Sequence, residues 1–92
     1  MKSILQGERE CFMCGSTQWL EEHHIYGGAN RKISEANGFK VFLCHHCHNE
    51  PPYGVHHNRE SRLKLQADCQ AKYESMGHTR QEFMSKIGRS YL

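Results

Sequence analysis

The sequence predicts a small α+β domain, in which a β-hairpin and a short helix are followed by further C-terminal helices. Two Cys-x-x-Cys pairs, at 11–14 and 44–47, can together supply four thiolates to one tetrahedral metal site. With 92 residues, of which only 37% are hydrophobic, the chain can bury a modest core, so a metal staple is expected. We therefore predict a zinc-stapled hairpin whose structural Zn²⁺ ligands are Cys11, Cys14, Cys44 and Cys47.

The chain length indicates a single domain, residues 1–92, with three parts. Residues 1–10 are polar and are expected to form a loosely docked tail, 11–57 the zinc-stapled core, and 58–92 a helical extension. The N-terminus lacks the apolar segment of an export signal, and no run approaches the roughly 20 apolar residues of a membrane span. We therefore expect a cytoplasmic protein with no membrane partner, in which the thiols stay reduced.

Two short strands are predicted between the cysteine pairs. Residues 17–25 favour a strand in which Trp19 and Ile25 share one face by period-two alternation. The run FKVFL, at 39–43, is rich in aromatic and branched residues and forms the second strand. The loop between the strands is rich in glycine and asparagine and is expected to contain a helical turn at 34–37.

Helical signals begin at Asn58, which can cap a helix that runs to about Met76. A buried stripe repeats along this helix and comprises Leu65, Cys69, Tyr73 and Met76, with Cys69 as a small core residue. Gly77 ends the helix, and Thr79 and Glu82 form a capping box that opens a second one. The inner side of the second helix carries Phe83, Ile87 and Tyr91. The two helices are expected to form a buttress for the core or a surface for a homodimer.

The charge of the chain gives little guidance to a partner. The net charge is +2, with five Lys or Arg against six Asp or Glu in residues 1–50, and seven against four in 51–92. The basic excess lies in the C-terminal part, but such an excess is weak evidence for a nucleic-acid partner. A functional assignment must therefore rest on the candidate site.

The stretch LEEHHIYGG, residues 20–28, carries the adjacent pair His23 and His24, and a third histidine, His48, directly follows the last cysteine. Three histidines in addition to four cysteines can build a second metal site. In a regular strand His23 and His24 point to opposite faces. Both can serve one site only if the strand ends or twists there, and the two glycines that follow allow this.

Three motifs follow one another in the chain: Cys-x-x-Cys, a strand ending in His-His-Ile, and Leu-Cys-x-x-Cys-His. In this order and spacing they resemble the HNH endonuclease family, in the form that carries a four-cysteine zinc site. More narrowly, the chain is similar to small HNH proteins encoded by bacteriophages. The resemblance covers about residues 11–57 and implies a ββα-metal, treble-clef-like fold. It also implies a metal-dependent nuclease that acts in a bacterial or phage-infected bacterial cell.

The resemblance assigns different roles to the two histidines of the pair. In the family the first position binds the catalytic ion and the second is the general base, which implies His23 as ligand and His24 as base. His48 corresponds to the metal-binding position that opens the helix. A further histidine normally follows within one helical turn, but here NEPPYGV intervenes. The last ligand is then His56 or His57; we prefer His56, which ends the turn, and leave His57 to contact phosphate.

The asparagine that gives the family part of its name is also displaced. It normally precedes Leu-Cys on the second strand, at the position of Phe39 in this sequence. Its work in the family is to brace the loop that carries the base. Here Asn37, Asn30, Asn58 or a backbone carbonyl could substitute, and we expect Asn37 to do so.

Hydrolysis of a phosphodiester requires a base for the attacking water and a cation for the anionic phosphate. A neutral histidine suits the first task because its ordinary pKa lies near neutral pH. One divalent ion on His23, His48 and His56 suits the second, and it could be Mn²⁺, Ni²⁺, Zn²⁺ or Mg²⁺. Because nitrogen ligands suit magnesium poorly, we expect manganese or nickel to be at least as effective. As in the family, the products would carry 5′-phosphate and 3′-hydroxyl ends.

The expected partner is duplex DNA, contacted through its backbone with little sequence preference. Five residues are expected to line the phosphate path, with His57 as a further phosphate contact: Arg31, Lys32, Arg59, Arg62 and Lys64. The neighbouring Glu21 and Glu22 are expected to be solvated strand residues or partners of the metal ligands. The alternative function is a zinc-stabilised nucleic-acid-binding module without catalysis.

Overall fold

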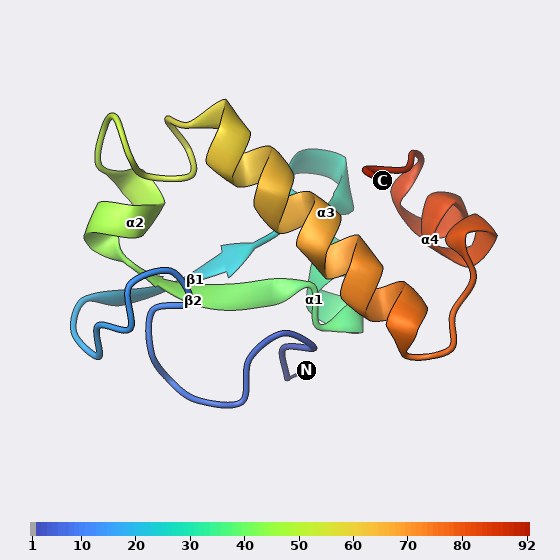
Figure 1. Cartoon of the computed structure of the whole chain (residues 1–92), viewed down its shortest axis with the longest axis horizontal. Coiled ribbons are helices and arrows are strands. Elements are labelled where there is room, and N and C mark those ends of the chain that lie inside the picture. The colour runs from blue at the N-terminus through green and yellow to red at the C-terminus, as the bar shows by residue number, and fades with distance from the viewer. Residues whose placement is uncertain (1) are drawn as a thin grey trace.

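A two-stranded antiparallel sheet lies at the centre of the computed structural model, which describes residues 2–92 (Figure 1). Strand β1 (Leu20–His24) pairs with β2 (Lys40–Cys44), in a register that sets Leu20 opposite Cys44 and His24 opposite Lys40. The branched and aromatic residues of β2 favour an extended backbone. The predicted α+β class, with an antiparallel hairpin and helices, is confirmed.

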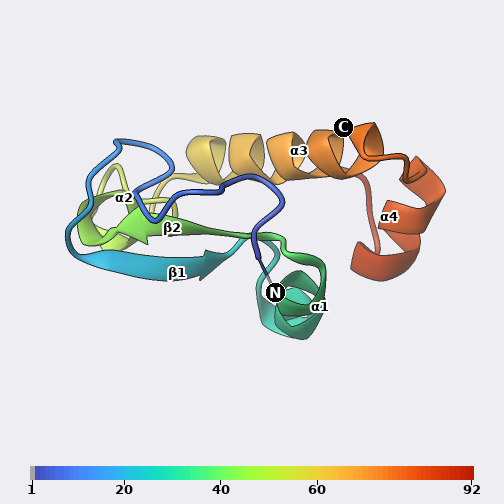
Figure 2. The ribbon, with the colours of Figure 1, turned by 90° about the horizontal axis from the view of Figure 1, so that it is seen from below.

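The helical elements are η1 (Gly28–Asn30), α1 (Arg31–Asn37), α2 (His45–Asn49), α3 (Arg59–Ser75) and α4 (Arg80–Ile87). Figure 2 shows α3 running across one face of the hairpin, while α1 lies on the other side at the end where β1 stops. Both predicted helix starts are confirmed. Asn58 Oδ1 accepts from the backbone N–H of Ser61 at the start of α3, and Thr79 and Glu82 cap α4 reciprocally.

The loop between the strands is anchored at both ends. The predicted helical turn at 34–37 is confirmed as the last part of α1. Ser34 Oγ is buried, donates to the carbonyl of Tyr26 and accepts from its N–H, which ties α1 to the end of β1. Gly38 ends α1 with φ of 74°, a left-handed conformation that glycine adopts without strain.

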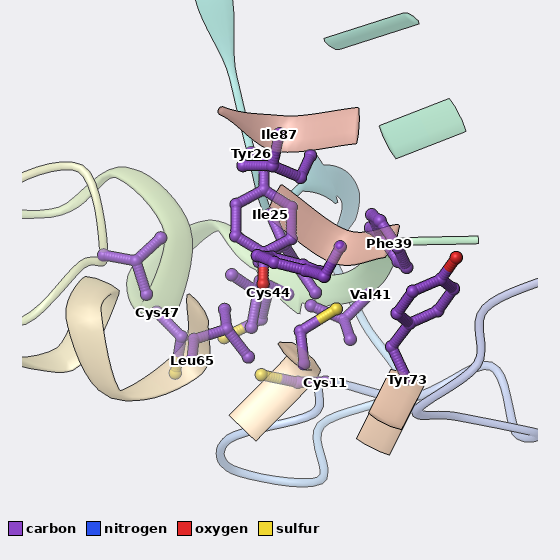
Figure 3. Close-up of a cluster of buried hydrophobic side chains, with 14 residues drawn as sticks. Cys11, Ile25, Tyr26, Phe39, Val41, Cys44, Cys47, Leu65, Tyr73 and Ile87 are labelled. Carbon is purple, nitrogen blue, oxygen red and sulfur yellow. The ribbon is translucent and has the colours of Figure 1, made fainter. Parts of the chain in front are cut away.

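The hydrophobic core lies between the hairpin and the two long helices (Figure 3). Tyr26 sits at its centre, with its ring edge-on to Phe39 at 5.5 Å and to Phe83 at 5.3 Å between centroids. The core side chains of the helices are Leu65, Cys69, Tyr73, Phe83 and Ile87, all of them buried. Cys69 is fully buried, as its predicted place in the stripe requires.

Two sequence predictions about the ends of elements are wrong. The first strand begins at Leu20 rather than at 17, because Trp19 has φ of 56°, which breaks the alternation. Its carbonyl instead accepts from the N–H of His45, and its side chain is 81% exposed rather than on the face of Ile25. Met76 is 51% exposed because α3 has already ended at Ser75.

The N-terminal residues are docked rather than loosely attached. The N–H of Ile4 donates to the carbonyl of Gly38 at 3.0 Å, and Gln6 Oε1 accepts from the N–H of Phe42 at 2.8 Å. The N–H of Phe12 donates to the carbonyl of Phe42, and the side chain of Ile4 packs against the core. This segment therefore covers the outer edge of β2, which would otherwise present unpaired backbone groups.

None of the helices that the structure describes between residues 2 and 92 has the length and apolar character that a membrane crossing requires.

The docking of the N-terminal segment can be tested at Gly38. A Cβ at this position would collide with the carbonyl oxygen of Lys2 and approach Ile4 Cγ2 to 3.3 Å. Gly28→Ala is the matched control, because Gly28 also has positive φ, of 58°, but has no atom within 4 Å of a new Cβ. We expect Gly28→Ala to lower the free energy of unfolding by about 1 kcal/mol and Gly38→Ala by about 2 kcal/mol or more, measured by urea denaturation. Equal losses would contradict the docked N-terminus.

Candidate functional site

Four cysteines meet at the end of the hairpin where β2 stops. Each of Cys11, Cys14, Cys44 and Cys47 offers a sulfur, and these sulfurs all lie within 4.8 Å of one another. The first pair comes from a tight turn in which the N–H of Gly15 donates to the carbonyl of Cys11 at 2.9 Å. Cys44 ends β2 and Cys47 lies in α2. Four sulfurs at this spacing suit the closed tetrahedral geometry of a structural zinc ion, so the four cysteines can hold one.

The electrostatics of the cysteine cluster also favour a cation. Burial raises the pKa of the Cys11 thiol, but the backbone N–H groups of Cys44, Cys14 and Met13 outweigh burial and lower the pKa to about 6. Burial and the neighbouring thiol of Cys44 raise the pKa of Cys47. One thiolate therefore hinders the ionisation of the next, and a bound divalent cation removes that hindrance.

Three histidines form a second cluster on the face of the hairpin that α3 covers. His23 Nδ1 lies 3.2 Å from His48 Nε2, and His48 Nε2 lies 2.9 Å from His56 Nε2. Their ligand atoms all lie within 4.8 Å of one another. His23 comes from β1, His48 from α2, and His56 from the segment that precedes α3.

The insertion after His48 brings His56 to the cluster. The N–H of Val55 donates to the carbonyl of Cys47 at 2.8 Å, and the N–H of His56 donates to the carbonyl of His48 at 3.2 Å. Val55 is fully buried, which anchors the returning segment. His57 is exposed and lies outside the group of three, so of the two candidates the structure brings His56 to the cluster.

The histidine cluster fits a divalent ion on its own chemistry. Burial, together with the charges of His48 and His56, lowers the pKa of His23 to about 3, so its ring is neutral near pH 7. Burial also lowers the pKa of His56. Among residues 2–92, His23 Nε2 is a buried side-chain nitrogen with no hydrogen-bond partner, while Nδ1 of the same ring is the nitrogen that faces His48. Neutral imidazoles with converging nitrogens are suitable ligands.

Glu21 orients one of these ligands. Its Oε1 accepts from His48 Nδ1 and from Asn49 Nδ2, both at 2.8 Å, and its Oε2 lies 3.0 Å from His45 Nδ1. The hydrogen bonds from His45 and His48 lower the pKa of Glu21 to about 2, so it only accepts. His48 therefore carries its proton on Nδ1 and turns the Nε2 lone pair toward the cluster. Glu21 stands two residues before His23, on the same face of β1, and its contact with His48 agrees with one of the two roles expected for it, that of a partner of the candidate metal ligands.

His24 lies on the opposite face of the hairpin from His23. β1 ends at His24 but keeps its register with β2 to that point, so the two neighbouring side chains point to opposite sides. His24 Nε2 lies 2.9 Å from Glu35 Oε1, and Arg31 Nε lies 3.4 Å from His24 Nδ1. The hairpin therefore does not turn the side chains of His23 and His24 into one site.

Three asparagines were expected as possible braces for His24, but each of them forms its side-chain hydrogen bond with another group. Asn37 Nδ2 donates to the carbonyl of Ile33 within α1, and Asn30 Nδ2 donates to the carbonyl of Ile87. Asn58 caps α3. The side chain that holds His24 is Glu35, which the sequence did not single out because the contact depends on how α1 packs against the hairpin.

The face that carries His24 is also the more open one. A cleft of about 410 Å³ lies there, lined in part by Arg9, Glu22, Lys40 and Phe42, and it is separate from the histidine cluster. Of the residues expected to contact phosphate, all are exposed except the half-buried Arg62; the exposed ones are Arg31, Lys32, His57, Arg59 and Lys64. Of these, Arg31 contacts His24. Near the histidine cluster the cation is Arg62, whose Nη1 donates to the carbonyl of Val55.

Comparisons of this chain with protein-family models, curated proteins and solved structures give no match. Its function is therefore argued from the cysteine cluster, the histidine cluster and the surroundings of His24.

The cysteine assignment predicts one tightly held zinc ion per chain after mild chelation, measured by metal analysis. Cys47→Ser should lose this ion and most of the thermal transition, because a structural zinc ion contributes on the order of 10 kcal/mol to folding. Cys69→Ala is the control, since it removes a buried thiol outside the cluster and should keep the ion despite a lower melting temperature. Zinc retained by Cys47→Ser, or two tightly held ions in the wild type, would contradict the assignment.

Proposed function

We propose that the chain is an HNH-type endonuclease that hydrolyses DNA phosphodiester bonds with one divalent ion on His23, His48 and His56. The observation that carries the proposal is the convergence of three imidazole nitrogens within 4.8 Å, directly beside a separate four-cysteine cluster. Two distinct sites of these ligand types match a structural zinc ion and a reactive divalent ion.

The order of the elements also supports the proposal. Strands β1 and β2 are followed at once by α2, which carries Cys47 and His48. A hairpin that leads into a ligand-bearing helix is the arrangement of the ββα-metal, treble-clef-like fold to which the sequence motifs point. In this proposal α3 and α4 are an added layer that supports the nuclease core.

The proposed reaction is the addition of water to a phosphodiester. The oxygen of water forms a bond to phosphorus, the bond from phosphorus to the 3′ oxygen breaks, and a 5′-phosphate and a 3′-hydroxyl result. His24 takes one proton from the attacking water, and the departing 3′ oxygen takes a proton from solvent. A divalent ion bound by the histidine cluster supplies positive charge to the phosphate and to the leaving oxygen.

The ligands also limit the choice of ion. Three neutral nitrogens suit manganese, nickel or zinc better than magnesium, which prefers oxygen ligands. His48 is held by Glu21, a carboxylate that strengthens a histidine as a ligand. The proposal therefore expects cleavage with manganese or nickel at least equal to cleavage with magnesium.

DNA is the proposed substrate because a cation lies near each histidine site, the exposed Arg31 at His24 and the half-buried Arg62 at the histidine cluster. Arg31 contacts His24, while Arg62 lies close enough to His23 and His56 for its charge to lower their pKa values. Lys32 and Arg59 are exposed and can approach phosphates from solvent. Contacts of this kind bind the backbone and do not read base sequence.

The alternative is a zinc-stabilised nucleic-acid-binding module without catalysis, and one observation favours it. His24 points away from His23 and is held by Glu35, so a substrate must reach around the end of β1 to meet both groups. His24 is nonetheless close enough for its charge to lower the pKa of His23. The end of β1 is therefore where the proposal places the scissile phosphate.

The test is nicking of supercoiled plasmid by the zinc-loaded protein with added manganese. We expect wild type to nick, and His24→Ala to lose about 10²-fold or more in rate, as general-base catalysis requires. His78→Ala is the control because His78 lies at the start of α4, where it pairs with Glu82 and stacks on Tyr73. It should keep the wild-type rate.

Three results would each contradict a part of the proposal. Cleavage by a folded His24→Ala protein at the wild-type rate would remove His24 as the base. Cleavage with magnesium alone would contradict the histidine ligand set. No cleavage with any divalent ion, combined with retained salt-sensitive DNA binding, would favour the binding module.

A further inference from the structure

Four charged or titratable side chains gather around His24 on the open face of the hairpin. Glu35 from α1 holds His24 Nε2 at 2.9 Å, and Glu22 from β1 lies 3.7 Å from the same nitrogen. Lys40, which faces His24 across the sheet, lies 2.6 Å from Glu35 and 3.3 Å from Glu22. Arg31 from α1 approaches the other nitrogen of the ring.

This group does not need a metal ion to balance its charge. The ligand atoms of Glu22, His24 and Glu35 lie within 4.8 Å of one another, as in a metal site. However, Lys40 Nζ already lies between the two carboxylates and supplies the positive charge that an ion would bring. An ion placed there would meet the ammonium group at close range and would be repelled.

The neighbours of His24 select one tautomer of its ring. The hydrogen bonds from Lys40 and His24 lower the pKa of Glu35 to about 2, so this carboxylate is ionised and can only accept. His24 Nε2 must then carry the proton. On the other side Arg31 Nε can only donate, so His24 Nδ1 must present a lone pair. Both neighbours therefore favour the same tautomer, the ionised Glu35 strongly at 2.9 Å and the exposed Arg31 weakly at 3.4 Å.

The position of Glu35 is itself well fixed. Ser34 beside it is buried and bonded to Tyr26, and Gly38 closes α1 one turn later. Lys40 holds the second carboxylate oxygen, so both oxygens of Glu35 have a partner. A carboxylate fixed in this way can orient a ring as well as bond to it.

We propose that Glu35 is the positioning residue of His24. It holds the ring with the proton on Nε2, so that the Nδ1 lone pair can take the proton of the attacking water once the exposed Arg31 turns away from it. The assignment rests on the proposed function, since it needs His24 to act as a base. When Nδ1 takes that proton, both ring nitrogens bear hydrogen and the ring becomes an imidazolium. The Glu35 carboxylate stabilises this cation, as the acid in a carboxylate–histidine pair does.

The experiment reads the tautomer directly. Long-range ¹⁵N–¹H spectra of the zinc-loaded protein, recorded in alkaline buffer where imidazole is neutral, distinguish the protonated from the unprotonated ring nitrogen of His24. We expect Nε2–H in the wild type and loss of this preference in Glu35→Ala. Glu22→Gln is the matched control, because it removes an equal charge that also pairs with Lys40 but lies 3.7 Å from His24. It should keep the wild-type tautomer.

Plasmid nicking gives the second readout. We expect kcat to fall about 10- to 100-fold in Glu35→Ala with KM for plasmid unchanged, and Glu22→Gln to change neither strongly. A Glu35→Ala protein that keeps the Nε2–H tautomer would overturn the assignment, as would an unchanged kcat in a variant that has lost it. Absence of nicking by the wild type contradicts the proposed function instead, and the tautomer then still decides whether Glu35 orients His24.

Discussion

The close approach of two Cys-x-x-Cys turns at one end of the hairpin is the constraint on which the rest of the structure depends. It joins the turn at Cys11 and Cys14 to the end of β2 and the first turn of α2. Because α2 starts directly at His45, the same junction sets His48 next to His23 of β1. A small core alone would define these positions weakly.

Strand alternation then divides the histidines between two environments. On the covered face, His23, His48 and His56 are close together with converging nitrogens, and burial lowers the pKa of His23 to about 3. On the open face, His24 is surrounded by Glu35, Arg31, Glu22 and Lys40, an environment of fixed charges. The first set of groups suits a divalent ion, whereas the second suits a proton acceptor whose tautomer is selected by its neighbours.

Sequence signals that act locally predicted their structures well. The cysteine pairs, the Asn58 cap and the capping box of α4 depend on spacing within a few residues, and each forms as expected. Features that depend on tertiary packing were missed. The left-handed backbone of Trp19 and the docking of Ile4 on Gly38 leave no local pattern. The contact of Glu35 with His24 depends on the direction of α1, which sequence spacing does not give.

The central claim is that the ring nitrogens of His23, His48 and His56 bind one divalent ion apart from the cysteine site. The most direct measurement is anomalous X-ray scattering from crystals of the zinc-loaded protein exposed to manganese. The account expects two separate peaks, zinc among the four cysteine sulfurs and manganese about 2 Å from the histidine nitrogens. A manganese peak among Glu22, His24 and Glu35, or none outside the cysteine site, would contradict it.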